Sequence, residues 1–192
     1  MIRVVLASAS PRRHELLSTI GVSFTVREPD IDESPNDDET PAAYVRRLAS
    51  AKAAAISASA DELVIAADTT VDLDGQILGK PVDERDAAAM LHRLSGRTHR
   101  VHTGVSVRRN GTEHVDVCTT LVTFVALDEA TIDWYVSTGE PLDKAGAYAL
   151  QGAGAALVHS VEGSVSNVVG LPLHAVIELA ARGGVDLLDR SG

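Results

Sequence analysis

The stretch THRVHTGVSVRRNGTEHVDVCTTLVTFVA, residues 98–126, decides what kind of sheet this chain builds. Its two halves, Thr98 to Arg109 and Glu113 to Ala126, alternate between apolar and polar side chains with the period of a β-strand. Asn110 and Gly111 separate the halves, and this residue pair favours a two-residue hairpin turn. The stretch therefore predicts a long antiparallel hairpin in the middle of the chain.

The N-terminal stretch combines a strand with a helix. Ile2 to Ala7 is a short apolar run typical of a buried strand, and the small residues Ser8 to Ser10 lead into a helix that Pro11 opens. Free backbone N–H groups and the helix dipole favour an anion at such a point. Arg12 and Arg13 in the first turn are unfavourable next to that dipole, so we expect a negative group between them.

The rest of the sequence predicts both strand-to-helix connections and hairpins. Thr40 is expected to cap a helix that runs to about Ala60 and carries Lys52, and an apolar strand over 63–67 is expected to end at Asp68. Asp74 and Gly75 turn a second hairpin, which leads to Lys80. Further expected elements are strands over 23–27 and 155–161 and helices over 83–96, 128–138 and 173–182.

Strand-helix steps together with hairpins predict the fold class. We expect an α/β fold of the mixed α+β kind, in which helices pack a mixed sheet. The chain has 192 residues and no linker long enough to separate two domains, so residues 1–192 are interpreted as one domain, with two lobes at most.

Composition excludes several classes of protein. The single cysteine, Cys118, rules out a disulfide framework and a cysteine-rich zinc site. A net charge of −10 argues against a nucleic-acid-coating surface, which needs a basic stripe. The longest uncharged runs are broken by Gly, Pro, Asn or Gln, and the apolar opening is too short for a signal peptide. We therefore expect a cytoplasmic protein without membrane or nucleic-acid partners.

Several familiar motifs are missing or weak. The chain contains no P-loop, no HExxH and no GxSxG. Asp72 and Asp74 resemble an aspartyl-phosphate DxD pair, but a turn role for Asp-Gly is the favoured interpretation. His99 and His102, expected on one face of a strand, could bind metal, although a surface strand explains them better without a third ligand.

What remains is a set of polar groups at the ends of elements. They are Ser8, Ser10, Arg12, Arg13, Lys52, Asp68, Thr69 and Lys80. Cleavage of a polyphosphate needs cations for the oxygens, a divalent metal for the developing charge, and a carboxylate that orients or deprotonates water. Lysine is scarce here, with three lysines among 17 basic residues, so Lys52, Lys80 and Lys144 draw attention as compact cations.

Four collinear stretches resemble the signature segments of the Maf family. They are LASASPRRHELL (6–17), AADTTVDLDGQILGKP (66–81), SGRTHRVHTGV (95–105), and the long segment from GEPLDKAG to VVGLPL (139–173). That family is related to the inosine triphosphatase superfamily. The resemblance implies a two-lobed fold around a long mixed sheet, with a site in the cleft. It also implies hydrolysis of nucleoside triphosphates to the monophosphate and pyrophosphate, with Mg²⁺ or Mn²⁺, in nucleotide housecleaning and with a link to septum formation.

The resemblance also implies roles for single residues. Asp68 corresponds to the proton acceptor, and Glu33 joins it as a metal ligand. The positions that bind the triphosphate are Ser8, Arg13, Lys52 and Lys80. Members selective for dTTP and UTP carry the residues found here as Arg12, Thr69 and Gln151.

Gln151 also makes sense chemically, because an amide both donates to and accepts from a pyrimidine edge. Lys144 is expected near the site, either for a direct role or for a salt bridge. Family members are often dimers, so a homodimer is an expectation by analogy.

Two alternatives use the same pocket. One is a nucleotide-binding regulator of cell division without turnover, and the other is a pyrophosphatase for modified or non-pyrimidine nucleotides. Release of pyrophosphate across a panel of nucleotides would separate them.

Overall fold

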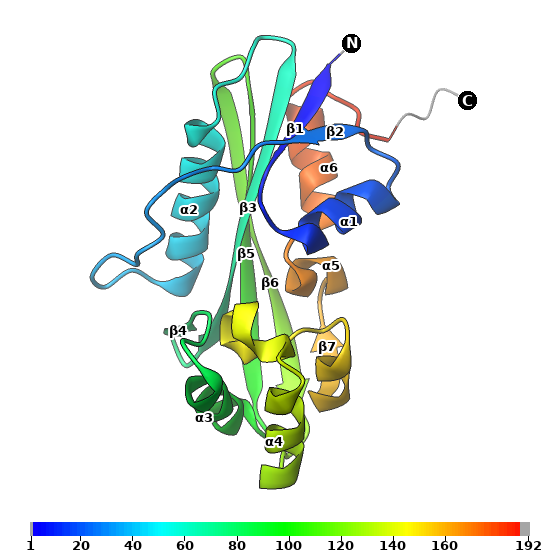
Figure 1. Ribbon diagram of the computed structural model, residues 1–192. Coiled ribbons are helices and arrows are strands. Elements are labelled where there is room, and N and C mark those ends of the chain that lie inside the picture. Colours follow the sequence, from blue (N-terminus) through cyan, green and yellow to red (C-terminus); the bar gives the residue numbers. More distant parts are fainter. Residues whose placement is uncertain (1, 189–192) are drawn as a thin grey trace.

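The computed structural model describes residues 2–188, which are organised around one long twisted sheet (Figure 1). The strand order is β2-β1-β3-β5-β6-β7, with β4 paired to β3. The strands in that order are β2 (Phe24–Val26), β1 (Arg3–Ala7), β3 (Glu62–Leu73), β5 (Thr98–Arg109), β6 (Thr112–Phe124), β7 (Val158–Glu162) and β4 (Gln76–Leu78).

The sheet is mixed, as the sequence predicted. β1 runs parallel to β2 and β3, whereas β3, β5, β6 and β7 pair antiparallel. The β5–β6 hairpin turns at Asn110 and Gly111, whose φ angles of 49° and 76° are the left-handed values that this turn needs. The expectation of a long central hairpin is confirmed.

Helices surround the two ends of the sheet. They are α1 (Pro11–Thr19), α2 (Pro41–Ala55), α3 (Glu84–Leu94), α4 (Glu129–Ser137), α5 (Val165–Val169) and α6 (Leu173–Arg182), with short 3-10 turns η1 (Glu140–Asp143), η2 (Ala145–Ala147) and η3 (Ala153–Leu157). α1, α2 and α6 lie around one half of the sheet, and α3 and α4 lie around the other (Figure 1). Within residues 2–188, no helix is long and apolar enough to cross a bilayer.

Two apolar clusters form the cores of two lobes. The upper cluster packs α1 and α6 on β1, β3 and β5, with Leu17, Ile65 and Leu179 among its members. The lower cluster packs α3, α4 and η2 on the other ends of β3, β5 and β6, and includes Leu91 and Tyr135. Because β3 and β5 contribute to both clusters, the same strands connect the lobes.

Gly104 on β5 lets α2 lie directly against the sheet. A Cβ at Gly104 would come within 2.2 Å of the carbonyl oxygen of Val45 on α2. No side chain can be accommodated at that separation. This contact sets how closely α2, and with it Lys52, approaches the sheet.

Three expected boundaries are wrong. β3 continues through Asp68 to Leu73, because β5 pairs with it along the whole distance. α2 ends at Ala55 rather than near Ala60, and β7 begins at Val158 after the 3-10 turn η3. The first difference matters for the site, since it places Asp68 inside a strand rather than at its end.

Candidate active site

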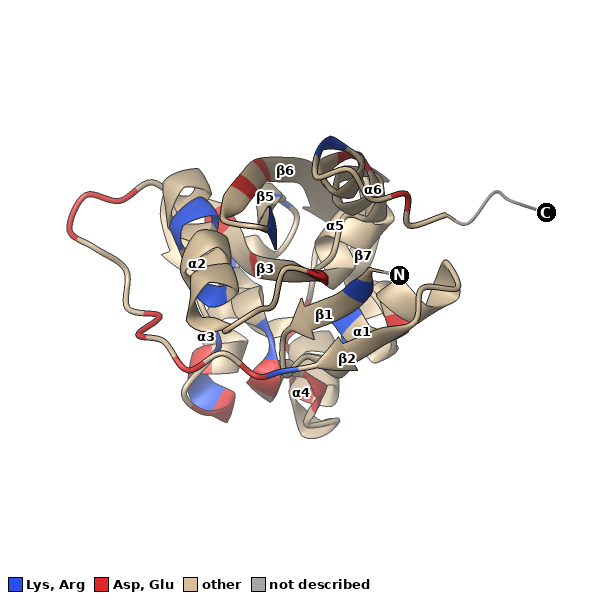
Figure 2. Cartoon of the chain, turned by 90° about the horizontal axis from the view of Figure 1, so that it is seen from above, with Lys and Arg blue, Asp and Glu red and all other residues tan. Residues whose placement is uncertain are grey.

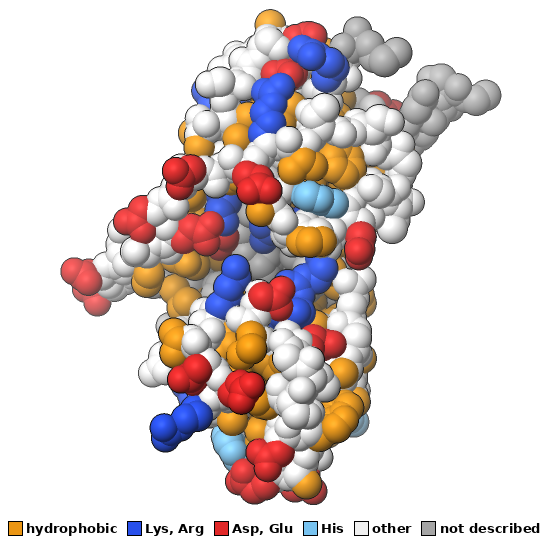
Figure 3. Space-filling model, in the orientation of Figure 1, with side chains coloured by type: hydrophobic (Ala, Val, Ile, Leu, Met, Phe, Trp, Pro, Cys, Tyr) orange, Lys and Arg blue, Asp and Glu red, His pale blue; other side chains and the backbone are white. Residues whose placement is uncertain are grey.

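A cavity of about 550 Å³ lies between the two lobes. Figure 3 shows the hollow at mid-height, with Lys and Arg side chains gathered around it. Its walls come from the β1–α1 turn, α2, β3, the segment after β4, and the segment over 143–151. A volume of this order is typical of a site for a small organic ligand.

The cavity opens on a gap in the sheet. β1 pairs with β3 as far as Ala66, and β4 pairs with β3 only from Val71 onward. Residues 67–70 of β3 are therefore paired with β5 on one side only, and three of them, Asp68, Thr69 and Thr70, border the cavity. A side chain within a strand, such as Asp68, can in this way reach a ligand.

Asp68, Lys52 and Glu33 meet in the cavity wall. Lys52 Nζ lies 2.6 Å from Asp68 Oδ1 and 2.7 Å from Glu33 Oε1. The side chains of Lys52 and Asp68 are each 9% exposed, whereas that of Glu33 is 54% exposed. Burial raises the pKa of the Asp68 carboxyl, and the charges of Lys52 and Arg13 oppose that rise without cancelling it. A buried carboxyl of raised pKa is a suitable proton acceptor.

The acidic segment before α2 is held against that helix. The hydroxyl of Tyr44 donates to the carbonyl oxygen of Glu33 at 2.9 Å, and Arg47 donates to the carbonyl oxygen of Ser34 and to Glu39. Burial raises the pKa of Tyr44 to about 12, and the negative charges of Asp68 and Glu33 add to the rise. Figure 2 shows the acidic residues along this exposed segment. Most of the segment is exposed, as expected, but Glu33 is directed to the cavity.

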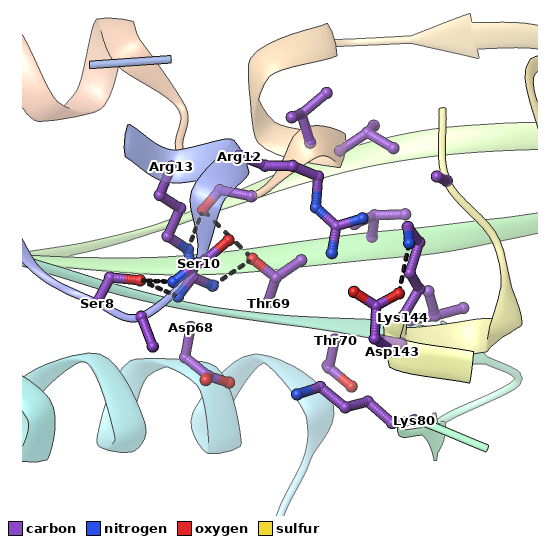
Figure 4. A pocket seen from close by; sticks show the side chains of 18 of the residues that line it. Ser8, Ser10, Arg12, Arg13, Asp68, Thr69, Thr70, Lys80, Asp143 and Lys144 are labelled. Atoms are coloured by element: carbon purple, nitrogen blue, oxygen red, sulfur yellow. Dashed lines mark hydrogen bonds and ion pairs between the residues drawn. The ribbon is translucent and has the colours of Figure 1, made fainter. Parts of the chain in front are cut away.

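Arg13 connects three elements on the opposite wall. Its Nε donates to the carbonyl oxygen of Gly170 at 2.8 Å, and its two terminal nitrogens donate to Ser8 Oγ and Thr69 Oγ1 at 3.3 and 3.2 Å. Figure 4 shows this cluster around the start of α1. A guanidinium has five N–H groups, so two remain for a ligand. Burial lowers the pKa of Arg13, and the carboxylates of Asp68 and Glu33 act against that change.

Thr69 is engaged within the protein. Its hydroxyl accepts from Arg13 and lies 2.9 Å from the hydroxyl of Thr103, which donates to the carbonyl oxygen of Asn167. Asn167 in turn donates to the carbonyl oxygen of Val101. Thr69 therefore connects Arg13 to a buried polar network in the sheet.

The remaining predicted residues line the cavity from other directions. Lys80 reaches in from the segment after β4, with its ammonium on the side of Asp68 (Figure 4). Arg12 and Gln151 also border the cavity. Lys144 donates to the carbonyl oxygen of Glu140 and pairs with Asp143, so it forms the salt bridge that was one of its two expected roles.

Nearly the whole chain, residues 3–182, matches the family model described as "Maf-like protein". The chain belongs to the Maf family. The resemblance noted in the sequence is thereby confirmed, and the site described above is the cleft of a Maf protein.

Curated relatives match this Maf chain over nearly its full length. The dTTP/UTP pyrophosphatase of Anaeromyxobacter dehalogenans is 54% identical over 189 residues, with 96% of each chain covered. That of Myxococcus xanthus is 54% identical, covering 96% of this chain and 94% of its own. That of Moorella thermoacetica is 53% identical, covering 99% and 100%.

Solved structures of low sequence identity are also similar. A nucleoside-triphosphatase, dITP/XTP pyrophosphatase, from Mycobacterium abscessus has a TM-score of 0.46 and 12% identity, with 95% of this chain and 98% of that chain covered. The Ham1 protein of Staphylococcus aureus has a TM-score of 0.44 and 19% identity, with coverage of 64% and 71%. The family assignment rests on the sequence match.

The donor set of this Maf cleft fits a hard divalent cation. Mg²⁺ in proteins is held by one or two carboxylates together with water and substrate phosphates. Glu33 and Asp68 supply two carboxylates that converge on a single ammonium. Among residues 2–188, no three His, Cys, Asp or Glu side chains cluster, so phosphate or water oxygens would complete the coordination.

The expectation that His99 and His102 share one face of a surface strand is wrong. His99 and His102 are three residues apart on β5, which places them on opposite faces of the sheet. His99 Nε2 lies 2.8 Å from the Tyr148 hydroxyl, and His102 Nε2 lies 3.1 Å from Asp72 Oδ2. Both are buried rather than on a surface strand. Asp72 also accepts from the N–H of Gly75, the turn role that was favoured for this motif.

Sequence patterns did not single out two residues at or beside the site. Tyr44 lines the cavity, and the Glu140 carboxylate accepts from the N–H groups of Ala153 and Gly154, close to Gln151. Tyr44 is eight residues before Lys52, and this spacing places both on one face of a helix. That periodicity could have placed Tyr44 at the site. Glu140 lies in the matched GEPLDKAG segment, but nothing in its spacing indicates which groups it contacts.

Proposed function

We propose that this chain hydrolyses nucleoside triphosphates, with dTTP and UTP favoured, to the nucleoside monophosphate and pyrophosphate. The observation that carries the proposal is the Asp68–Lys52–Glu33 cluster facing Arg13 and Ser8 across a cavity of ligand size. The relatives at 53–54% identity, named dTTP/UTP pyrophosphatases, support the choice of reaction and substrates.

The cationic side chains hold the triphosphate in this proposal. Arg13 has two N–H groups for phosphate oxygens, and Lys80 approaches from the opposite lobe. Lys52, placed between the carboxylates of Glu33 and Asp68, contributes a buried positive charge beside the proposed proton acceptor, Asp68. The backbone N–H groups of the turn that begins at Ser8 add donors at a helix N-terminus.

Asp68 acts as the proton acceptor. Water forms a bond to a phosphorus atom, the bond to the oxygen between the α and β phosphates breaks, and Asp68 takes the proton from water. Attack at the α or the β phosphorus gives the same two products. A divalent cation bound by Glu33 and Asp68 would neutralise negative charge on the phosphates.

The specificity residues divide into two kinds. No hydrogen bond engages the side chains of Arg12 and Gln151 among residues 2–188, so both can meet a base or sugar. Thr69 already binds Arg13 and Thr103, and we assign its contribution to the placement of Arg13.

Cellular role and assembly extend the proposal. The family resemblance supports housecleaning of the nucleotide pool in the cytoplasm, a link to septum formation, and a homodimer. Cell fractionation and the mass of the purified protein in solution test location and assembly.

A substrate panel tests the reaction. Release of pyrophosphate is measured for dTTP, UTP, CTP, GTP, ITP and modified nucleotides with Mg²⁺ or Mn²⁺. We expect dTTP and UTP to be cleaved with the highest kcat/KM. Equal turnover of GTP would contradict the specificity, and binding without release of pyrophosphate would favour a regulator.

A further inference from the structure

The segment that carries Gln151 is held at both ends by one pair of side chains. The Tyr135 hydroxyl accepts from the N–H of Ala149 at 3.1 Å and donates to Glu140 Oε1 at 2.8 Å. On the other side of Gln151, the N–H groups of Ala153 and Gly154 each donate to the Glu140 carboxylate at 2.9 Å. Leu150 to Gly152 is thus a short bridge between two fixed points.

Backbone geometry allows this approach only with glycine. Gly152 has a φ of 99°, a backbone angle that residues with a side chain rarely adopt, and a Cβ there would lie 2.4 Å from Glu140 Oε2. At Gly154, a Cβ would lie 2.6 Å from the Tyr135 hydroxyl. The two glycines let the main chain close around the Glu140 carboxylate and the Tyr135 hydroxyl.

The pair is built so that Glu140 stays ionised and Tyr135 stays protonated. Burial would raise the pKa of Glu140, but the N–H of Gly154, the hydroxyl of Tyr135 and the N–H of Ala153 outweigh it, and the pKa lies below its usual value. Tyr135 is fully buried, and burial raises the pKa of its hydroxyl. Hydrogen bonds to an ionised acceptor are stronger than those between neutral groups.

Gln151 itself has no such support. Its side chain is exposed, and the neighbouring Tyr148, Ala149 and Leu150 border the cavity with it. An amide that selects a base by hydrogen bonds must be correctly placed to within a fraction of an ångström. Here that placement can come only from the main chain.

We propose that Glu140 and Tyr135 are positioning residues for substrate selection, which fix the main chain on either side of Gln151 so that its amide meets a pyrimidine edge. The inference rests on the proposed function. Neither residue touches the substrate, so both act through Gln151.

A double-mutant cycle tests this positioning role. The probes are dTTP and GTP analogues in which an imido group replaces the oxygen between the α and β phosphates, and binding is measured by calorimetry. Glu140→Gln and Tyr135→Phe should each reduce the dTTP-to-GTP affinity ratio about fivefold to tenfold, the value of a lost hydrogen bond. With Gln151→Ala already present, either change should cause no further loss, because the interaction that it supports is gone.

The matched control is Glu62→Gln. Glu62 is likewise a carboxylate that accepts a backbone N–H, that of Ser59, but it lies far along β3 and pairs with Arg27. This variant should lose stability and keep the affinity ratio. Unfolding midpoints are measured for all variants, and Tyr135→Phe remains informative if Glu140→Gln does not fold.

Additive effects with Gln151→Ala, or an unchanged ratio in both single variants, would overturn the positioning role. A wild-type protein without preference for the dTTP analogue would overturn it as well. Failure of the proposed function has a different signature, because binding is measured separately from turnover. A selective wild-type protein that releases no pyrophosphate would refute hydrolysis and leave the cycle intact.

Discussion

Lys52 Nζ on α2 lies 2.6 Å from Asp68 Oδ1 on β3, and both side chains are almost completely buried. The same ammonium reaches Glu33, so one cation is shared by two carboxylates from separate segments. A buried charge without a partner is costly, and this sharing explains how Asp68 can be ionised within a strand.

Asp68→Asn should remove most activity and preserve the fold. Lys52 keeps Glu33 as its partner, whereas the group proposed to accept a proton from water is lost. We expect pyrophosphate release from saturating dTTP to fall at least about 100-fold. Asp72→Asn is the control, since it changes a buried carboxylate four residues along the same face. Turnover near the wild-type rate in Asp68→Asn would refute the assignment.

Glu33→Gln should weaken the response to metal. Glu33 is proposed to supply one of two carboxylates to a divalent cation. Replacing that carboxylate with the amide of glutamine should raise the Mg²⁺ concentration needed for half-maximal rate by about tenfold or more. A titration with Mg²⁺ after removal of metal by a chelator measures this. Asp37→Asn, in the same acidic segment, should leave the titration unchanged. Equal Mg²⁺ curves for wild type and Glu33→Gln would exclude Glu33 as a ligand.

Gly104→Ala should destabilise the protein. The added Cβ would collide with the carbonyl oxygen of Val45, and the backbone of α2 must move away from β5. Overpacking of this kind costs about 3 kcal/mol of unfolding free energy, measured by urea denaturation. A Cβ at Gly79 would meet no atom within 4 Å, so Gly79→Ala is the matched control. A similar small change in both variants would contradict the tight packing.

His99 should make stability depend on pH. Burial lowers its pKa from 6.5 to about 4, so between these values the unfolded chain binds a proton that the folded protein does not. The free energy of unfolding should therefore rise with pH across this range, by about 3 kcal/mol. In His99→Gln this part of the rise should disappear in urea denaturation at a series of pH values. An identical pH profile in wild type and variant would show that His99 is not responsible.

Local patterns predicted most elements of the fold. α1 begins at Pro11, α6 spans Leu173–Arg182 as expected, and the Asn110–Gly111 turn is where the residue pair placed it. These features depend on side chains within one turn or one strand. The end of β3 was missed, because the length of a strand depends on whether a partner such as β5 continues beside it.

The candidate site, like the fold, was predictable only in part. The family resemblance predicted that Ser8, Arg13, Lys52, Asp68 and Lys80 belong to one site, and the structure brings all five to one cavity. Their contacts were not predictable from spacing. Thr69 proved to bind Arg13, and Lys52 proved to bridge Glu33 and Asp68, since such pairs form only when separate elements pack together.

The amino-acid sequence by itself determined the family, the mixed sheet and the identity of the chemical groups in the cleft. Periodicity, turn residues and collinear motifs are properties of neighbouring residues, so they do not depend on how distant parts of the chain pack. Only the tertiary structure decided that Asp68 borders a gap between β1 and β4, and that Tyr135 and Glu140 hold the segment around Gln151. Those relationships depend on hydrogen bonds of 2.8–3.1 Å between separate elements, and only the packing of those elements brings the partner atoms together.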